Sequence, residues 1–138
     1  MEILLKIISF VLLVSLVIFP IFILKQLKKR KTKNVFILYL IISLLITFIL
    51  ILIIAWWSNF SNKLLLSHLG YDFDAMNDIQ RFQNVASENL DKVKKLRIAM
   101  MGIGWPLKAF IFYPFYLPYL LIVYFGSSFL TRIKQKSN

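Results

Sequence analysis

Cysteine is absent from this chain of 138 residues, and histidine occurs only once. Disulfide bridges, thiolate metal sites and cysteine nucleophiles are therefore excluded. Acidic residues are also few: six Asp and Glu stand against 17 Lys and Arg, which gives a formal net charge of +11 at pH 7. Charged residues make up 17% of the chain, whereas a soluble domain averages roughly 25%. This composition argues against a soluble enzyme, a disordered chain and a disulfide-stabilised secreted domain.

What the chain does contain is long apolar runs, and 59% of its residues are hydrophobic. Three stretches lack any Asp, Glu, Lys or Arg, and they are Ile7–Leu24, Asn34–Asn62 and Ala109–Thr131. Crossing roughly 30 Å of hydrocarbon takes about 20 apolar residues in a helix. The sequence therefore predicts an all-α integral membrane protein, a single membrane domain over residues 1–138. The three predicted transmembrane helices cover residues 3–24, 35–57 and 109–130.

The segment between the second and third spans has the character of a soluble protein, and it predicts one amphipathic helix over residues 75–100. This helix is extramembrane or interfacial, with Asp74 as its expected N-cap. Apolar residues recur along it at steps of three and four, as on one face of an α-helix. We expect this stripe to pack within the molecule or against a partner protein. The candidate interaction residues are Ile79, Phe82, Leu90, Val93 and Leu96.

Two features of the spans suggest helix packing. Ser43, Thr47 and Ala55 recur at multiples of four in the second span, and small residues with this spacing let another helix approach closely. The alternative is that they are incidental in a helix that faces lipid. In the third span, Pro114 and Pro118 lie one turn apart and remove two backbone donors. We expect them to bend or loosen that helix.

Basic residues gather between the first two spans, where six of the 17 cations fall within residues 25–33. This loop is too short for a nucleic-acid recognition module and brings no stacking aromatics with it, so nucleic acid is not an expected partner. It predicts a topology signal and contact with anionic lipid headgroups. Lys108 is an isolated cation near Trp105, and its side chain either snorkels to the headgroups or meets an anionic group of a substrate or lipid. The candidate headgroup-binding residues are Lys28, Lys29, Arg30, Lys31 and Lys108.

The distribution of cations also predicts an orientation. Cations flanking the first two spans place the N-terminus outside, and the 25–33 loop and C-terminal tail in the cytoplasm of a plasma (inner) membrane. The third span disagrees, because five cations precede it and three follow it. An alternative is that residues 98–131 form a re-entrant hairpin, which would return the tail to the outside face.

Reactive chemistry is sparse. No Asp, Glu or His lies inside a predicted span, which argues against proton-driven carriers and histidine-ligated haem. The polar residues with ligand potential are His68, Asp72, Asp74 and Asp78. A solvated loop with a helix cap explains these residues more simply than a weak metal site. We therefore expect no metal, no cofactor and no enzymatic activity.

The expected function is that of a small, non-catalytic membrane protein acting through helix–helix and protein–protein contacts. Such a protein would be an accessory or assembly subunit of a membrane complex. Its partners would be membrane lipids and either other membrane subunits or further copies of itself. One alternative is an immunity or exclusion protein that blocks a pore-forming toxin or a phage within the bilayer. A second is a small oligomeric pore, which shares only its layout with phage holins and has a thin polar lining.

Overall fold

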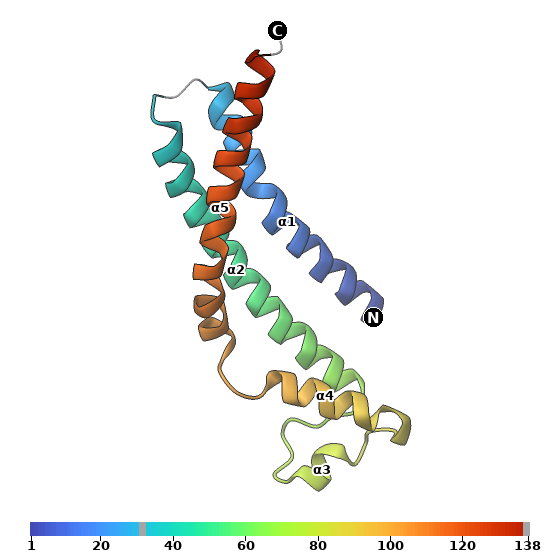
Figure 1. Ribbon diagram of the computed structural model, residues 1–138. Coiled ribbons are helices and arrows are strands. Elements are labelled where there is room, and N and C mark those ends of the chain that lie inside the picture. The colour runs from blue at the N-terminus through green and yellow to red at the C-terminus, as the bar shows by residue number, and fades with distance from the viewer. Residues whose placement is uncertain (31–32, 137–138) are drawn as a thin grey trace.

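The computed structural model describes residues 1–30 and 33–136, and within them the secondary structure is helical, without strands (Figure 1). The elements are α1 (Glu2–Lys29), α2 (Val35–His68), α3 (Asp78–Phe82), the 3₁₀ helix η1 (Ser87–Asn89), α4 (Leu90–Met100) and α5 (Trp105–Lys136). Helices α1, α2 and α5 are long and apolar enough to cross a membrane. The expectation of an all-helical chain with three such helices is confirmed. The short helices α3 and α4 lie at one end of the bundle.

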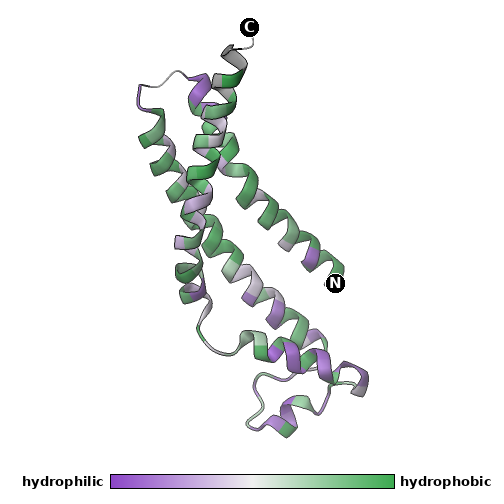
Figure 2. Ribbon diagram, in the orientation of Figure 1, coloured by the Kyte–Doolittle hydropathy of each residue, from purple (hydrophilic) through white to green (hydrophobic). Residues whose placement is uncertain are grey.

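Helix α2 is much longer than the predicted span. Its 34 residues extend over about 51 Å, against roughly 30 Å of bilayer hydrocarbon. The part after Trp57 accounts for about 16 Å of this length. Figure 2 shows the change along α2, from hydrophobic residues in its first part to hydrophilic residues toward its end. The sequence pattern missed this extension because hydropathy falls where polar residues begin, while the helical backbone continues.

The buried face of α2 carries the small residues that the sequence singled out. Ser43 and Thr47 are fully buried, and Tyr39 and Ile51 continue the same stripe one turn to either side. Both α1 and α5 contact α2. The Thr47 hydroxyl donates to the Ser43 carbonyl at 2.6 Å, which satisfies a polar group inside its own helix. The interpretation that Ser43 and Thr47 face lipid is inconsistent with this burial, whereas Ala55 is only half-buried.

A second cluster joins the helices at the end that carries residues 25–33, of which residues 25–29 form the last turn of α1 rather than part of the predicted loop. Its buried residues are Ile23, Leu24, Leu27 and Tyr39. Beside it, the Lys28 ammonium donates to the Ser127 hydroxyl at 2.9 Å, which ties the end of α1 to α5. The turn and the C-terminal end of α5 therefore lie together, and the N-terminus lies at the opposite end with α4 (Figure 1). The alternative of a re-entrant hairpin over 98–131 is wrong, because α5 is one uninterrupted helix and Lys108 lies in its first turns.

A proline in α1 determines how α5 meets it. Pro20 has no backbone N–H, so the carbonyl of Leu16 lacks its usual helical donor. The Tyr116 hydroxyl donates to that carbonyl at 2.5 Å, and the Tyr119 hydroxyl donates to the Val17 carbonyl at 2.8 Å. In a helix that crosses a membrane, no water reaches such a carbonyl, so the donor has to come from a neighbouring helix. The two tyrosines of α5 therefore hold it against the second half of α1.

The two prolines of α5 have a different position from the one expected. The helix continues through Pro114 and Pro118, so they do not break it, and both are exposed. The contacts between helices come from tyrosines on the other side of α5. The Tyr113 hydroxyl, for example, donates to the Leu44 carbonyl of α2 at 2.9 Å. Pro114 and Pro118 thus lie on the outer surface of the bundle rather than at a helix contact.

Replacing Tyr116 by Phe tests the Pro20 contact. We expect the free energy of unfolding in detergent to fall by about 1 kcal/mol, because the Leu16 carbonyl loses its donor. In a Pro20→Leu background the restored N–H bonds this carbonyl, so Tyr116→Phe should cost less. Denaturant titration followed by circular dichroism gives the double-mutant cycle. Tyr124→Phe is the control, since its hydroxyl makes no hydrogen bond within the described part of the chain. An equal cost of Tyr116→Phe in both backgrounds would contradict the proposed coupling.

Candidate functional site: a helical lobe and the cavity beside it

Residues 66–104 form a small helical lobe at the N-terminal end of the bundle (Figure 1). The lobe has a hydrophobic interior of its own, separate from the cluster near the 25–33 turn. Its buried residues are Leu66, Tyr71, Val85 and Val93. Half-buried residues pack around them, and these are Leu69, Phe82, Leu90, Leu96 and Met100. The last turn of α2 thus supplies part of the core on which the lobe is built.

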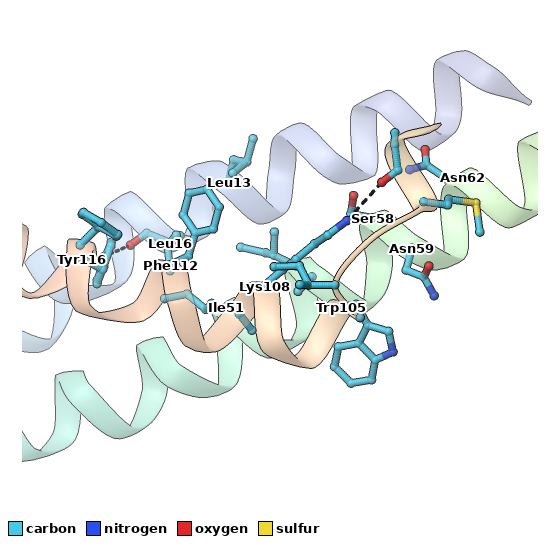
Figure 3. A pocket seen from close by; sticks show the side chains of 18 of the residues that line it. Leu13, Leu16, Ile51, Ser58, Asn59, Asn62, Trp105, Lys108, Phe112 and Tyr116 are labelled. Carbon is cyan, nitrogen blue, oxygen red and sulfur yellow. Dashed lines mark hydrogen bonds between the residues drawn. The ribbon is translucent and has the colours of Figure 1, made fainter. Parts of the chain in front are cut away.

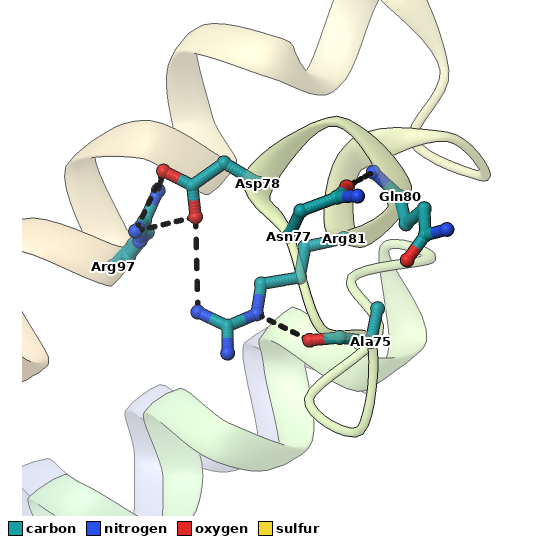
Figure 4. A network of polar contacts seen from close by, with 6 residues as sticks. All are labelled: Ala75, Asn77, Asp78, Gln80, Arg81 and Arg97. Atoms are coloured by element: carbon teal, nitrogen blue, oxygen red, sulfur yellow. Dashed lines mark hydrogen bonds and ion pairs between the residues drawn. The ribbon is translucent and has the colours of Figure 1, made fainter.

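The prediction of one continuous helix over 75–100 is wrong. Helix α3 ends at Phe82, residues 83–86 form a turn, and α4 begins at Leu90 after η1. The N-cap is also different, because the Asn77 side chain, rather than that of Asp74, accepts the backbone N–H of Gln80 at 2.8 Å (Figure 4). A straight helix would spread the apolar stripe over about 39 Å. The break instead folds α3 back, so that both halves of the stripe reach one core.

Four of the five candidate interaction residues pack into this core. They lie within the lobe core or surround it, as the intramolecular alternative predicts, and they are Phe82, Leu90, Val93 and Leu96. The fifth, Ile79, is 86% exposed. Two neighbouring apolar side chains, Met76 and Phe73, are also exposed, the first of them at 96%. We call Phe73, Met76 and Ile79 the lobe tip.

Polar contacts and one glycine fix the shape of the lobe. Gly70 has φ +89°, and a Cβ there would lie 2.3 Å from the Asn84 carbonyl oxygen. The turn after α2 therefore requires glycine. The Arg97 guanidinium of α4 donates to the Asp78 carboxylate of α3 at 2.9 and 3.1 Å (Figure 4). The same guanidinium lies 5.7 Å from the centre of the Phe82 ring. The Asp78 carboxylate raises the pKa of Arg97 above its ordinary value.

The lobe is also connected to α1. The Lys92 ammonium of α4 pairs with the Glu2 carboxylate at the start of α1, and Lys6 pairs with the same carboxylate at 3.0 Å. One turn further along α1, the Ser9 hydroxyl accepts the indole N–H of Trp57 at 3.0 Å. The N-terminal half of α1 is therefore held by α2 and α4. Figure 1 shows that this half lies apart from α5, which α1 approaches only in its second half.

A cavity of about 750 Å³ lies between α1, α2, α5 and the linker that leads into α5 (Figure 3). One part of its lining is apolar and includes Leu13, Leu16, Ile51, Ile54, Phe112 and Phe115. The other part, which we call the rim, is polar and consists of Ser58, Asn59, Asn62, Lys63 and Lys108. The Lys108 ammonium donates to the Ala99 carbonyl at 3.1 Å, which holds it at the rim. Tyr116 lines the apolar part at its contact with Leu16.

The candidate headgroup-binding residues do not form one surface. Lys28 is hydrogen-bonded to Ser127, while Lys29 and Arg30 are exposed at the same end of the bundle. Lys31 lies outside the described residues. Lys108 is at the opposite end, on the cavity rim. The sequence therefore combined two separate groups of cations.

The other rim residues were missed by sequence reasoning. They follow the Trp56–Trp57 pair and were placed beyond the predicted second span, in the segment with the character of a soluble protein; they are Ser58, Asn59, Asn62 and Lys63. Their spacing of three and four residues was an available signal, because it continues one face of α2. The polar residues thus begin at the same point where α2 was expected to end.

Replacing Leu66 by Ala tests whether the lobe has an independent core. Leu66 is 1% exposed, so this change should cost about 2–5 kcal/mol through lost burial and a cavity. We expect faster hydrogen exchange and proteolysis over residues 70–104, with α1 and α5 protected as before. Ile79→Ala is the matched control and should leave both unchanged, because its side chain is exposed. Uniform loss of protection across the whole bundle would contradict a separate lobe core.

Reactive groups do not gather anywhere in residues 1–30 and 33–136. No group of three or more His, Asp and Glu side chains in these ranges could hold a metal ion. The carboxylates of the lobe are used locally: Asp72 accepts the backbone N–H of Asp74 at 2.9 Å, and Asp78 binds Arg97. Comparison with known family models, curated proteins and solved structures finds no match to this chain.

Proposed function

We propose that this chain is a non-catalytic, multi-pass membrane protein that serves as an accessory or assembly subunit of a membrane complex. The observation that carries this proposal is a lobe whose apolar stripe is used internally while an apolar tip remains exposed. Large apolar side chains also cover the outside of the long helices, among them Phe10, Leu45, Ile122 and Phe129, each more than half exposed. Water disfavours so extensive an apolar surface, whereas lipid accepts it.

The position of the lobe tip favours a protein partner over lipid. If Trp56 and Trp57 lie in the interfacial aromatic belt, α2 extends about 12 Å beyond it before the lobe begins at Leu66. Figure 1 shows α3 at the far end of the lobe from the bundle. The ion pair between Asp78 and Arg97 fastens α3 to α4 and so holds Ile79 in position. A held, apolar, water-exposed tip is typical of a protein contact.

The proposed location is a plasma (inner) membrane, with the N-terminus and the lobe outside. The 25–33 turn and the C-terminal end of α5 would then lie in the cytoplasm. In support, the structure brings these two cation-rich segments to one end of the bundle. Two of the cations that precede the third span and favour the opposite orientation, Lys92 and Arg97, are each paired with a carboxylate. The pore alternative is weakened, since Ser43 and Thr47 are buried inside the bundle rather than facing a water path.

Single-cysteine labelling tests the membrane topology, and the cysteine-free sequence makes the background clean. Gln80→Cys places an exposed thiol on the lobe, and Lys29→Cys places one at the opposite end of the bundle. With a membrane-impermeant maleimide, we expect Gln80→Cys to react in intact cells and Lys29→Cys to react only after permeabilisation. The reverse pattern would contradict the orientation, and labelling of both in intact cells would contradict membrane spanning.

Copurification in mild detergents tests the role as a subunit. We expect the chain to elute with a defined partner, and the double variant Met76→Asp, Ile79→Asp to lose that partner because it places charge on the apolar tip. The matched control is Gln83→Asp, Ser87→Asp, which adds the same charge at exposed polar positions of the lobe and should keep the partner. A chain that elutes alone in several mild detergents, or a tip variant that retains its partner, would argue against the proposal.

A further inference from the structure

We propose that the cavity beside the lobe binds one anionic phospholipid, with its phosphate at the rim and the start of an acyl chain in the apolar part. This inference rests on the proposed membrane insertion and adds a specific ligand to it. The volume of about 750 Å³ is in the range of small-molecule sites in proteins. The division of the lining into an apolar part and a cationic rim matches the two ends of a phospholipid.

The apolar part is open toward the region where lipid chains would lie. Ile51 forms a buried part of the wall, with 7% exposure. In contrast, Leu13, Phe112 and Phe115 line the cavity and are themselves 53%, 69% and 78% exposed. Side chains that line a cavity and also face outward lie at its lateral opening. An acyl chain can therefore enter sideways from the bilayer without passing through the protein.

The rim has the chemistry that a phosphodiester needs. Lys63 and Lys108 contribute two positive charges, and Asn59 and Asn62 contribute amide donors. Among the described residues that line this cavity, none carries a carboxylate. The Lys108 ammonium uses one N–H on the Ala99 carbonyl, which leaves two for a ligand. The surplus of positive charge selects a headgroup with net negative charge over a zwitterionic one.

The carboxylate on the adjoining groove does not cancel this charge. That groove, of about 460 Å³, shares Leu13, Ser58 and Asn62 with the cavity and is lined by Glu2. The Glu2 carboxylate is paired with two other lysines, Lys6 and Lys92. Within residues 1–30 and 33–136, the cations of the cavity rim therefore have no acidic partner in its lining and remain available for a phosphate.

The depth of the cavity also suits a lipid. Trp105 begins α5 and lines the cavity, and indole rings concentrate at the boundary between headgroups and hydrocarbon. Along α2 the lining runs from Ile51 to Lys63, a rise of about 18 Å that crosses this boundary. The rim then lies at the level of the phosphates and the apolar part at the level of the chains.

Native mass spectrometry of the purified, detergent-solubilised chain tests this inference. Phosphatidylglycerol and phosphatidylcholine with identical chains are titrated in parallel, and inorganic phosphate is added as a competitor. We expect at least tenfold tighter binding of phosphatidylglycerol and no competition from phosphate. The double variant Lys63→Gln, Lys108→Gln should weaken phosphatidylglycerol binding by about 25-fold, from roughly fivefold for each lysine near a membrane surface. The matched control, Lys94→Gln, Lys95→Gln, removes two exposed cations of α4 and should bind as the unchanged protein does.

A second variant keeps the charge and changes the shape. Ala55 lines the cavity, so Ala55→Phe should fill part of it and weaken binding of phosphatidylglycerol. Circular dichroism and gel filtration establish that each variant is folded before it is compared. Equal binding of the two lipids, equal loss in both lysine pairs, or displacement by phosphate would overturn the inference. A chain that needs detergent but binds no lipid contradicts only this inference, whereas a chain soluble without detergent contradicts the proposed membrane insertion.

Discussion

The hydrogen bond from Tyr116 to the Leu16 carbonyl determines much of the shape of this bundle. Pro20 creates the need for it, because a helix that contains proline leaves one carbonyl without its donor, and hydrocarbon cannot supply another. The bond draws α5 to the second half of α1 only. The first half of α1 is held elsewhere, by Trp57 of α2 and by the lobe. The cavity forms where these neighbours hold α1 and where α5 does not contact it.

Helix α2 connects the apolar bundle to the lobe. Its first part presents small hydroxyl side chains, Ser43 and Thr47, which allow close packing because they occupy little volume and Thr47 bonds its own helix. Its last turns carry polar residues and end in Leu66, which anchors the core of the lobe. Because α2 is one continuous helix, its length fixes the distance between the aromatic residues of the bundle and the lobe. The cationic rim of the cavity lies at the transition between these two parts.

The lobe illustrates how far periodicity can be trusted. The steps of three and four along residues 75–100 correctly indicated which side chains are buried, since Phe82, Leu90 and Val93 all meet the lobe core. They did not indicate that the helix breaks, because a folded-back pair of short helices and one long helix have the same local spacing. The folded-back form is favoured by tertiary contacts, which are the close approach of Gly70 to the Asn84 carbonyl, the core around Leu66 and the ion pair between Asp78 and Arg97. Local spacing likewise did not indicate that Ile79 lies outside the lobe core.

By itself, the sequence determined the helical class and the three long apolar helices, because these depend on local hydropathy. The spacing of Ser43 and Thr47 left open whether they face lipid or another helix, and the packing of the bundle decided it. The sequence could not determine the cavity, since Leu13, Lys63 and Lys108 come from three different helices. The continuity of α5 through Pro114 and Pro118 was likewise beyond it. These features depend on contacts between helices, in which one helix supplies a hydrogen-bond donor or a cavity wall to another. Which helices make these contacts is decided by the free energy of packing the whole bundle, not by the preferences of any one segment.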